Sequence, residues 1–168
     1  MSTKINMTPE LASEKIISLL REVKREGIEN LINFIKESNY MTNAACYSHH
    51  NGQHGLMYHS LEVLDVMLRE ADAALSRESL IIVALCHDLG KARLNGKKVG
   101  DGFHPYRALY ILKMNGVQLS KFEEEAIGLH HSRNAKYSAN PLLRLLRHGD
   151  GRSARINQKG VKYSFCVL

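Results

Sequence analysis

The sequence predicts an all-α fold, a single-domain bundle of about seven helices. Three observations support this prediction. Apolar residues recur at helical spacing along most of the chain, and residues typical of helix starts and ends flank these stretches. The chain also has 168 residues, 44% of them apolar, which is enough for one domain with a substantial hydrophobic core.

The expected helices follow from capping residues and from apolar periodicity. Thr8 and Pro9 form a helix start, an N-cap residue followed by proline at the first helical position. Gly27 is expected to end this helix as its C-cap. Ser120 and Glu123 have the spacing of a capping box. The predicted helices cover about 8–27, 31–35, 56–75, 77–89, 104–116, 120–130 and 141–148.

The segments between these helices lack helical periodicity. Residues 39–55 are polar and contain glycine, so we expect a loop there. Its histidines, His49, His50 and His54, are expected on the surface, and the alternative is that they line the entrance of a pocket. Residues 91–103 are basic and glycine-rich, which favours a turn or small hairpin. The end of the chain, 161–167, alternates weakly like a short strand. Tyr58, Tyr106 and Tyr110 could stack on a base, but their helical spacing favours a place in the core. His148 is expected to have a structural role.

Charge is placed unevenly along the chain, which has a formal net charge of +6. We therefore divide the chain into a folded domain, 1–150, and a basic C-terminal tail, 151–168. A basic end suggests an anionic partner such as phosphate or nucleic acid, and a solvated tail that favours solubility is the alternative. Between Arg144 and the C-terminus one acid, Asp150, stands against six basic residues, Arg144, Arg147, Arg152, Arg155, Lys159 and Lys162.

Features of secreted or membrane proteins are not found in the sequence. The N-terminus is polar and does not resemble a signal peptide, and no apolar run approaches the roughly 18 residues that span a membrane. The three cysteines lack the spacing of a disulfide framework or a metal finger. We expect a cytoplasmic protein without a membrane partner, and the sequence leaves its oligomeric state open.

The stretch "IIVALCHDLGKAR", residues 81–93, carries the first sign of chemistry. An apolar helix ends in His87 and Asp88, and a carboxylate is rarely buried unless it is paired or binds a metal. Imidazole and carboxylate together bind divalent transition metals. Helices of a bundle can direct such residues to one interior point, so His59 and Asp150 could join the pair from neighbouring helices.

These residues resemble the motif of the HD-domain metal-dependent phosphohydrolase superfamily. His59 in "YHS", His87 and Asp88 in "HDLGK", and Asp150 in "RHGD" match its H…HD…D pattern. The resemblance implies an all-α fold that holds one or two divalent ions, with Mn, Fe, Co, Ni and Zn as candidates. Asp88 would bridge the two ions of the dinuclear branch. The implied metal ligands are His59, His87, Asp88, His104, His130, His131 and Asp150, with one or both of the His130–His131 pair binding.

The function implied by the resemblance is hydrolysis of a phosphate ester or anhydride by metal-activated water. The substrate would be a small nucleotide, with deoxynucleotides among the candidates. Asp88 and Lys91 are the expected catalytic residues. Lys91, Arg107 and Arg133 are candidate phosphate contacts, although Lys91 could instead complement the dipole at a helix end.

Two other functions remain open at the level of sequence. Some relatives of this superfamily use the same ligands in a di-iron oxygenase, and a third possibility is a non-catalytic module that binds nucleic acid or nucleotides. The GYP tripeptide of cyclic-dinucleotide hydrolases and the synthetase domain of stringent-response enzymes are absent. The sequence also lacks a P-loop, which binds phosphates, and a GxSxG element, which carries a nucleophilic serine.

Overall fold

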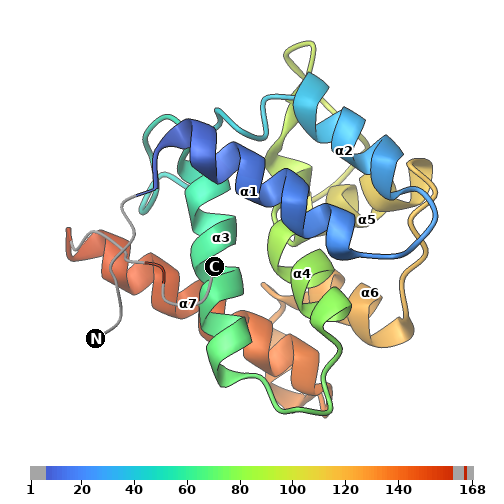
Figure 1. The fold of residues 1–168 in the computed structure, drawn as a ribbon. Helices are drawn as coiled ribbons and strands as arrows, with labels where there is room; N and C mark the ends of the chain where they lie inside the picture. Colours follow the sequence, from blue (N-terminus) through green and yellow to red (C-terminus); the bar gives the residue numbers. More distant parts are fainter. Residues whose placement is uncertain (1–6, 161–164, 166–168) are drawn as a thin grey trace.

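The structure, a computed structural model, describes residues 7–160 and residue 165 (Figure 1), and it confirms the predicted all-α fold. These residues form seven α-helices, two 3-10 turns and one two-stranded hairpin. The α-helices are α1 (Pro9–Glu22), α2 (Ile28–Glu37), α3 (Gly55–Glu70), α4 (Arg77–Cys86), α5 (His104–Met114), α6 (Lys121–Leu129) and α7 (Pro141–Gln158). The turns are η1 (Leu89–Lys91) and η2 (Arg133–Tyr137), and the predicted hairpin pairs β1 (Arg93–Leu94) with β2 (Lys97–Lys98).

Helices α3 and α4 form the centre of the bundle. Residues 80–86 of α4 are all buried and apolar, and α3 is buried along most of its length. In Figure 1, α1 lies across both of these helices, and it also packs against α2. On the other sides, α7 packs against α3 and α6, and α5 packs against α6 and η1. The end of α4 is therefore enclosed by elements from the whole chain.

The expected helix ends at Gly27 and at residue 75 are wrong, and both differences have a local cause. Helix α1 ends at Glu22, and Gly27 is instead the N-cap residue of α2 with φ of 80°. A Cβ on Gly27 would lie 2.4 Å from the Asn115 carbonyl oxygen, so this glycine permits a close approach of two backbones. Helix α3 ends at Glu70, because Asp72 forms a turn in which its carboxylate accepts from the amide of Ala74 (2.9 Å).

The last helix is longer than expected, because α7 continues ten residues past His148 to Gln158. The expected boundary at residue 150 thus lies inside a helix, and residues 161–164 and 166–168 of the expected tail lie outside the described residues. Gly149 suits the helix interior at this point, since a Cβ there would lie 3.2 Å from the Val63 carbonyl oxygen of α3. Small residues allow such close helix packing, which places Asp150 beside α3.

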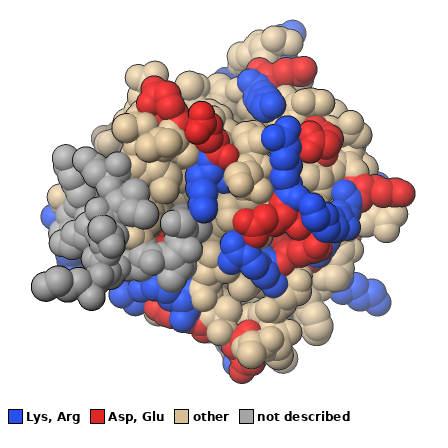
Figure 2. Space-filling model, in the orientation of Figure 1, with Lys and Arg blue, Asp and Glu red and all other residues tan. Residues whose placement is uncertain are grey.

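Much of the C-terminal basic charge makes contacts within the chain. Arg147 donates to the Ser132 carbonyl (2.7 Å), and Arg152 pairs with Glu70 of α3 (3.0 Å). His148 also pairs with Glu70 (3.0 Å), in keeping with its expected structural role. Figure 2 shows basic and acidic side chains interspersed over one face of the molecule. None of the described helices is both long and apolar enough to cross a membrane.

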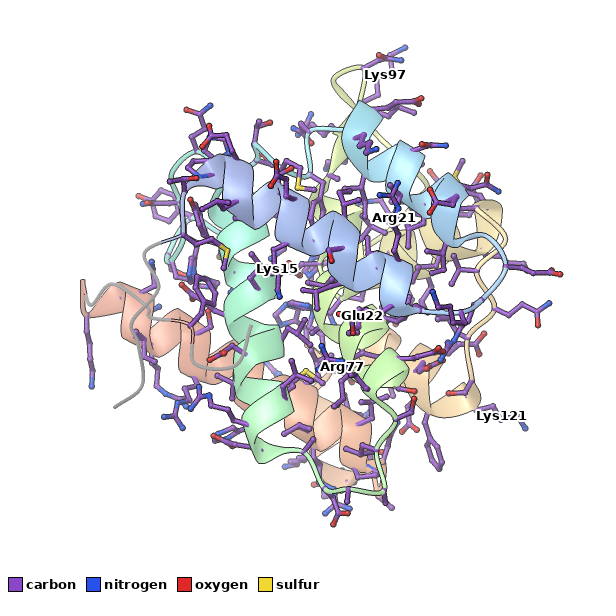
Figure 3. All side chains as sticks on the ribbon, viewed as in Figure 1. Lys15, Arg21, Glu22, Arg77, Lys97 and Lys121 are labelled. Atoms are coloured by element: carbon purple, nitrogen blue, oxygen red, sulfur yellow. The ribbon has the colours of Figure 1, made fainter. Side chains whose placement is uncertain are left out.

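Polar contacts near the N-terminal end of α4 connect it to neighbouring elements. The capping box of α6 is confirmed, and its Glu123 also binds Arg25 (2.7 Å) and Ser79 (2.6 Å). Arg77 at the start of α4 pairs with Glu22 of α1 (2.8 Å), two side chains labelled in Figure 3. These contacts join the loop after α1 to α4 and α6.

The expectation that tyrosines at helical spacing belong to the core is wrong for two of three. Tyr106 and Tyr110 of α5 are 57% and 52% exposed. Tyr58 is partly buried and donates from its hydroxyl to the Met7 carbonyl oxygen (3.0 Å). The exposed side of α5 therefore carries aromatic rings rather than charge alone.

We predict that Gly90→Ala separates η1 from α5. An added Cβ would lie 2.0 Å from the His104 carbonyl oxygen and 2.8 Å from the Ala108 amide nitrogen, and neither backbone atom can move alone. Overpacking of this kind lowers the free energy of unfolding by about 1–3 kcal/mol, measured by urea denaturation. Gly52→Ala is the matched control, since nothing lies within 4 Å of its Cβ, and equal effects of the two substitutions would contradict the prediction.

Candidate metal centre

Ring nitrogens of four buried histidines face one buried carboxylate at the centre of the bundle. Each of the four Nε2 atoms lies between 3.0 and 3.7 Å from an oxygen of Asp88. Buried polar atoms are normally hydrogen-bonded, so a group of unsatisfied atoms at one place requires an explanation. Among the described residues, the buried side-chain atoms without a hydrogen-bond partner are Nε2 of His59, His87, His104 and His130, Oδ1 of Asp88 and Oγ of Ser60.

The two oxygens of Asp88 face different histidines. Oδ1 lies 3.0 Å from Nε2 of His104 and 3.6 Å from Nε2 of His130. Oδ2 lies 3.5 Å from Nε2 of His87 and 3.7 Å from Nε2 of His59. The Asp88 side chain is only 2% exposed, so these rings form its surroundings. The carboxylate thus lies between two pairs of imidazoles, as a carboxylate shared by two cations would.

Two of the histidines are positioned by the same device at the end of a helix. His87 and His130 are the C-cap residues of α4 and α6, and both keep helical dihedral angles. The Nδ1–H of His87 donates to the Ala84 carbonyl (2.8 Å), and that of His130 donates to the Ile127 carbonyl (2.7 Å). The last carbonyls of a helix have no helical partner, so they can accept these bonds. Each bond fixes the tautomer that leaves the Nε2 lone pair free.

Asp88 leaves the helix one residue later. Helix α4 ends at Cys86 rather than at the expected residue 89, and Asp88 has φ of −103° and ψ of 7° before η1 begins. This change of direction aims His87 and Asp88 at the same place, although successive residues on a continuous helix diverge by about 100°. The buried apolar run before His87 anchors this helix end.

The structure brings together all seven ligands expected from the sequence. In one group, Asp88, His104, His130 and His131 offer atoms within 4.8 Å of one another. In the second group, His59, His87 and Asp150 do the same, and Oδ1 of Asp150 lies 3.1 Å from Nε2 of His59. His131 is exposed, whereas His130 is buried and more rigidly held. Each group could hold a metal ion.

The chemistry of these donors fits a transition metal. His59, His87 and His130 each use Nδ1–H in a bond to the protein, so their Nε2 atoms carry lone pairs and cannot donate to Asp88. A cation between these nitrogens and the carboxylate would satisfy both at once. Imidazole and carboxylate suit Mn, Fe, Co, Ni and Zn, and a site of nitrogen and oxygen donors without thiolate does not distinguish them.

Burial and charge keep the cluster in the protonation state that a metal needs. Burial lowers the pKa of His87 to about 3, and burial together with His130 lowers the pKa of His131 to about 4. Burial alone would raise the pKa of Asp88, but His87, His104, His130 and Lys91 hold that pKa well below its ordinary value. Metal ligands must be neutral imidazoles and ionised carboxylates, which these shifts favour.

Of the three expected phosphate contacts, Lys91 alone lies against the cluster. Its Nζ is 2.6 Å from Oδ2 of Asp88, so the two side chains lie on the same side of the turn. Arg107 instead donates from Nε to the Gly90 carbonyl (2.9 Å) and from Nη1 to the Gly102 carbonyl. Arg107 thus braces the segment between η1 and α5. Arg133 is exposed at the first residue of η2.

A second buried network supports His59, and the sequence did not indicate it. The Ser153 hydroxyl of α7 donates to Oε2 of Glu62 (2.5 Å) and accepts from Nδ1 of His59 (3.1 Å). The same Glu62 oxygen accepts from Nε2 of His50 (2.7 Å). The expectation that the histidines of the 39–55 loop lie on the surface is therefore wrong for His50, and the His49 ring lies 5.1 Å from that of His59.

One signal in the sequence points to this network in retrospect. Glu62 follows His59 by three residues on a helix with many apolar residues, and an acid buried among them needs a partner. The spacing alone does not name that partner, because His50 and Ser153 come from a loop and from a distant helix. The backbone of His50 adopts φ of 46°, an uncommon conformation for a residue other than glycine.

Comparisons with family models, with curated proteins and with solved structures gave no match to this chain. The geometry of the candidate metal centre is therefore the evidence on which an assignment of function depends.

We predict that the metal-free protein loses stability as the pH falls from about 6.5 to 4. His87 has a pKa of about 3 in the folded chain and an ordinary value of 6.5, so only the unfolded chain takes up this proton in that range. The free energy of unfolding then falls by up to about 1.4 kcal/mol per pH unit for such a group. Urea denaturation in EDTA measures this slope, and His87→Gln should reduce it; the same slope in both proteins would refute the prediction.

We also predict that Ser153→Ala weakens metal binding without removing a ligand. Loss of the hydroxyl frees Nδ1 of His59 and leaves Glu62 with His50 as its remaining partner, so the affinity for Co²⁺ or Zn²⁺ should fall by about 10–100-fold in competition titrations. Ser79→Ala is the matched control, because it removes a similar bond to a buried carboxylate, Glu123, at the other end of α4. An unchanged affinity in Ser153→Ala would show that the network does not support the metal.

Proposed function

We propose that this chain is a metal-dependent phosphohydrolase of the HD type, which uses water to cleave a phosphate ester or anhydride of a nucleotide. A small nucleotide is the simplest such substrate. The observation that carries the proposal is the position of Asp88 between two pairs of unsatisfied imidazoles, with one carboxylate oxygen facing each pair. The resemblance of the sequence to the HD pattern agrees with this arrangement.

The chemistry of a bound divalent ion would be to activate water at neutral pH and to polarise a phosphoryl oxygen. The residues of the chain would hold the ion and orient its ligands. Asp88 supplies the central negative charge, and the Nδ1–H bonds of His87 and His130 keep their Nε2 lone pairs directed inward. Asp150 and His131 are less buried than the other donors, so substrate would approach on their side.

Lys91 is the residue best placed to bind the phosphate. Its ammonium lies 2.6 Å from Oδ2 of Asp88, and the side chain is 19% exposed, so it reaches both the cluster and solvent. A cation at this position would neutralise a phosphoryl oxygen beside the centre. Arg107 would contribute by fixing the two ends of the segment that contains Lys91, and Arg133 stays a candidate for contacts farther out.

Two alternatives would use the same residues differently. A di-iron oxygenase would hold two irons in the two ligand groups and would consume oxygen. A module that only binds nucleotides or nucleic acid would keep its function after loss of the metal ligands. The complete set of seven donors and the position of Asp88 between two pairs of imidazoles favour hydrolysis over simple binding.

We predict phosphate or pyrophosphate release from a nucleotide panel when Mn²⁺, Co²⁺, Ni²⁺, Fe²⁺ or Zn²⁺ is restored after chelation. Asp88→Ala should abolish turnover and Asp88→Asn should nearly do so, because the amide keeps the shape but loses the charge. Lys91→Met should lower kcat/KM by about 100-fold, whereas Lys121→Met, at an exposed lysine of α6, should not.

Three measurements separate the proposal from its alternatives. Metal analysis of each sample reports whether one or two ions are bound. Oxygen consumption with two bound irons would favour the oxygenase. A metal-loaded protein that hydrolyses no phosphate ester or anhydride would contradict the proposed function.

A further inference from the structure

An exposed aromatic stripe runs along α5 and begins beside the metal centre. It consists of Phe103, Tyr106, Tyr110 and Met114, which are 55%, 57%, 52% and 53% exposed. At about 100° per residue, these four positions lie within roughly 80° of one another around the helix. Large apolar side chains that gather on a surface commonly mark a place where a partner binds.

The first residue of the stripe touches the rings of the centre. The Phe103 ring lies 4.5 Å from that of His104 and 6.0 Å from that of His131, measured between centroids. His104 faces Oδ1 of Asp88, so the exposed phenyl ring is one side chain away from the central carboxylate. A flat group stacked on Phe103 would place an attached phosphate near the candidate ligands.

A basic hairpin stands next to the stripe. Strands β1 and β2 carry three exposed cations, Arg93, Lys97 and Lys98, and Figure 3 shows Lys97 at the tip, pointing away from the body of the protein. The segment that follows the hairpin contacts α5, because Gly100, two residues after β2, lies against the Tyr110 ring, where a Cβ would be 2.8 Å from Cδ1. Asp101 is the acid of this segment, so positive charge prevails there.

Both ends of the hairpin segment are fixed at the metal centre. Lys91 precedes it and binds Asp88, and Phe103 ends it beside His104. Arg107 holds the two ends together through the carbonyls of Gly90 and Gly102. Farther along α5, Tyr110 and the exposed Lys113 line a surface cavity of about 570 Å³ between α5 and α6.

We infer that the α5 stripe and the hairpin form a binding surface for single-stranded nucleic acid that leads to the metal centre. Stacking rings combined with cations are the means by which proteins bind single strands without reading their sequence. The bases would stack on Phe103, Tyr106 and Tyr110, and Lys97 and Lys98 would bind backbone phosphates. This inference extends the proposed function, because the nucleotide at the centre would then belong to a strand.

The test measures binding in EDTA, so that it does not depend on metal or turnover. A fluorescent single-stranded oligonucleotide of about twelve residues is titrated with the full chain at low salt, and anisotropy gives Kd. Phe103→Ala, Tyr106→Ala and Tyr110→Ala combined should weaken binding at least about tenfold. Phe103→Ala alone should cause part of this loss. Phe103→Trp keeps a stacking ring and should bind the oligonucleotide as tightly as the unchanged chain does. Circular dichroism and thermal melting check that each variant is folded.

Matched controls separate this surface from general effects of charge and apolarity. Phe122→Ala removes an equally exposed ring, 60% exposed, at the start of α6 and should leave Kd unchanged. Lys97→Glu with Lys98→Glu should weaken binding and reduce the slope of log K against log salt by about 1.4. Lys15→Glu with Lys121→Glu changes the net charge equally at two positions that Figure 3 shows away from Lys97, and should have a smaller effect.

Several outcomes would overturn the inference. These are no binding at low salt, equal losses in Phe122→Ala and the stripe variants, or a dimer in light scattering that the stripe variants convert to a monomer. The last result would assign the stripe to a second copy of the chain. Strand binding without hydrolysis of any nucleotide would support the binding surface and refute the proposed function. Nucleotide hydrolysis without strand binding would support the proposed function and refute the binding surface.

Discussion

The buried carboxylate of Asp88 is the constraint around which the bundle is organised. An ionised group in a protein interior costs several kcal/mol unless opposite charge and hydrogen-bond donors surround it. Asp88 pairs with Lys91, and it is faced by imidazoles from the interior of α3, the ends of α4 and α6 and the start of α5. The apolar face of α4, the close packing of α7 on α3 and the brace at Arg107 all serve to hold these groups in place.

The orientation of the imidazoles shows how ordinary helix chemistry prepares such a centre. At the ends of α4 and α6, carbonyls that a helix leaves unpaired accept the Nδ1–H of the following histidine. At His59, where the helix continues and its carbonyls are occupied, the Ser153–Glu62 pair supplies the acceptor instead. In each case one nitrogen is fixed by the protein, and the other is left for a cation.

The sequence predicted which residues gather at the centre more completely than it predicted the residues that support them. Helix starts were recognised because caps are local, as at Thr8 and Ser120, and the motif histidines were recognised because their residue types are rare on apolar helices. Helix ends were harder, since Gly27 and Gly149 serve close approaches of backbones that only tertiary structure reveals. The role of Ser153 depends on a contact with Glu62 across 91 residues, and His50 reaches the same Glu62 from an irregular loop, so no local pattern encodes either contact. Arg107 likewise binds the carbonyls of Gly90 and Gly102, a contact between separate segments that the sequence does not indicate.

Anomalous diffraction from crystals grown with Mn²⁺ or Co²⁺ tests the central claim most directly. The account predicts one or two strong peaks beside Asp88, each within about 2.0–2.3 Å of Nε2 of its histidines and of one carboxylate oxygen. Two peaks on opposite sides of the carboxylate would make Asp88 the bridge. Crystals without an anomalous peak at this place, in which water joins the imidazoles to Asp88, would contradict the account.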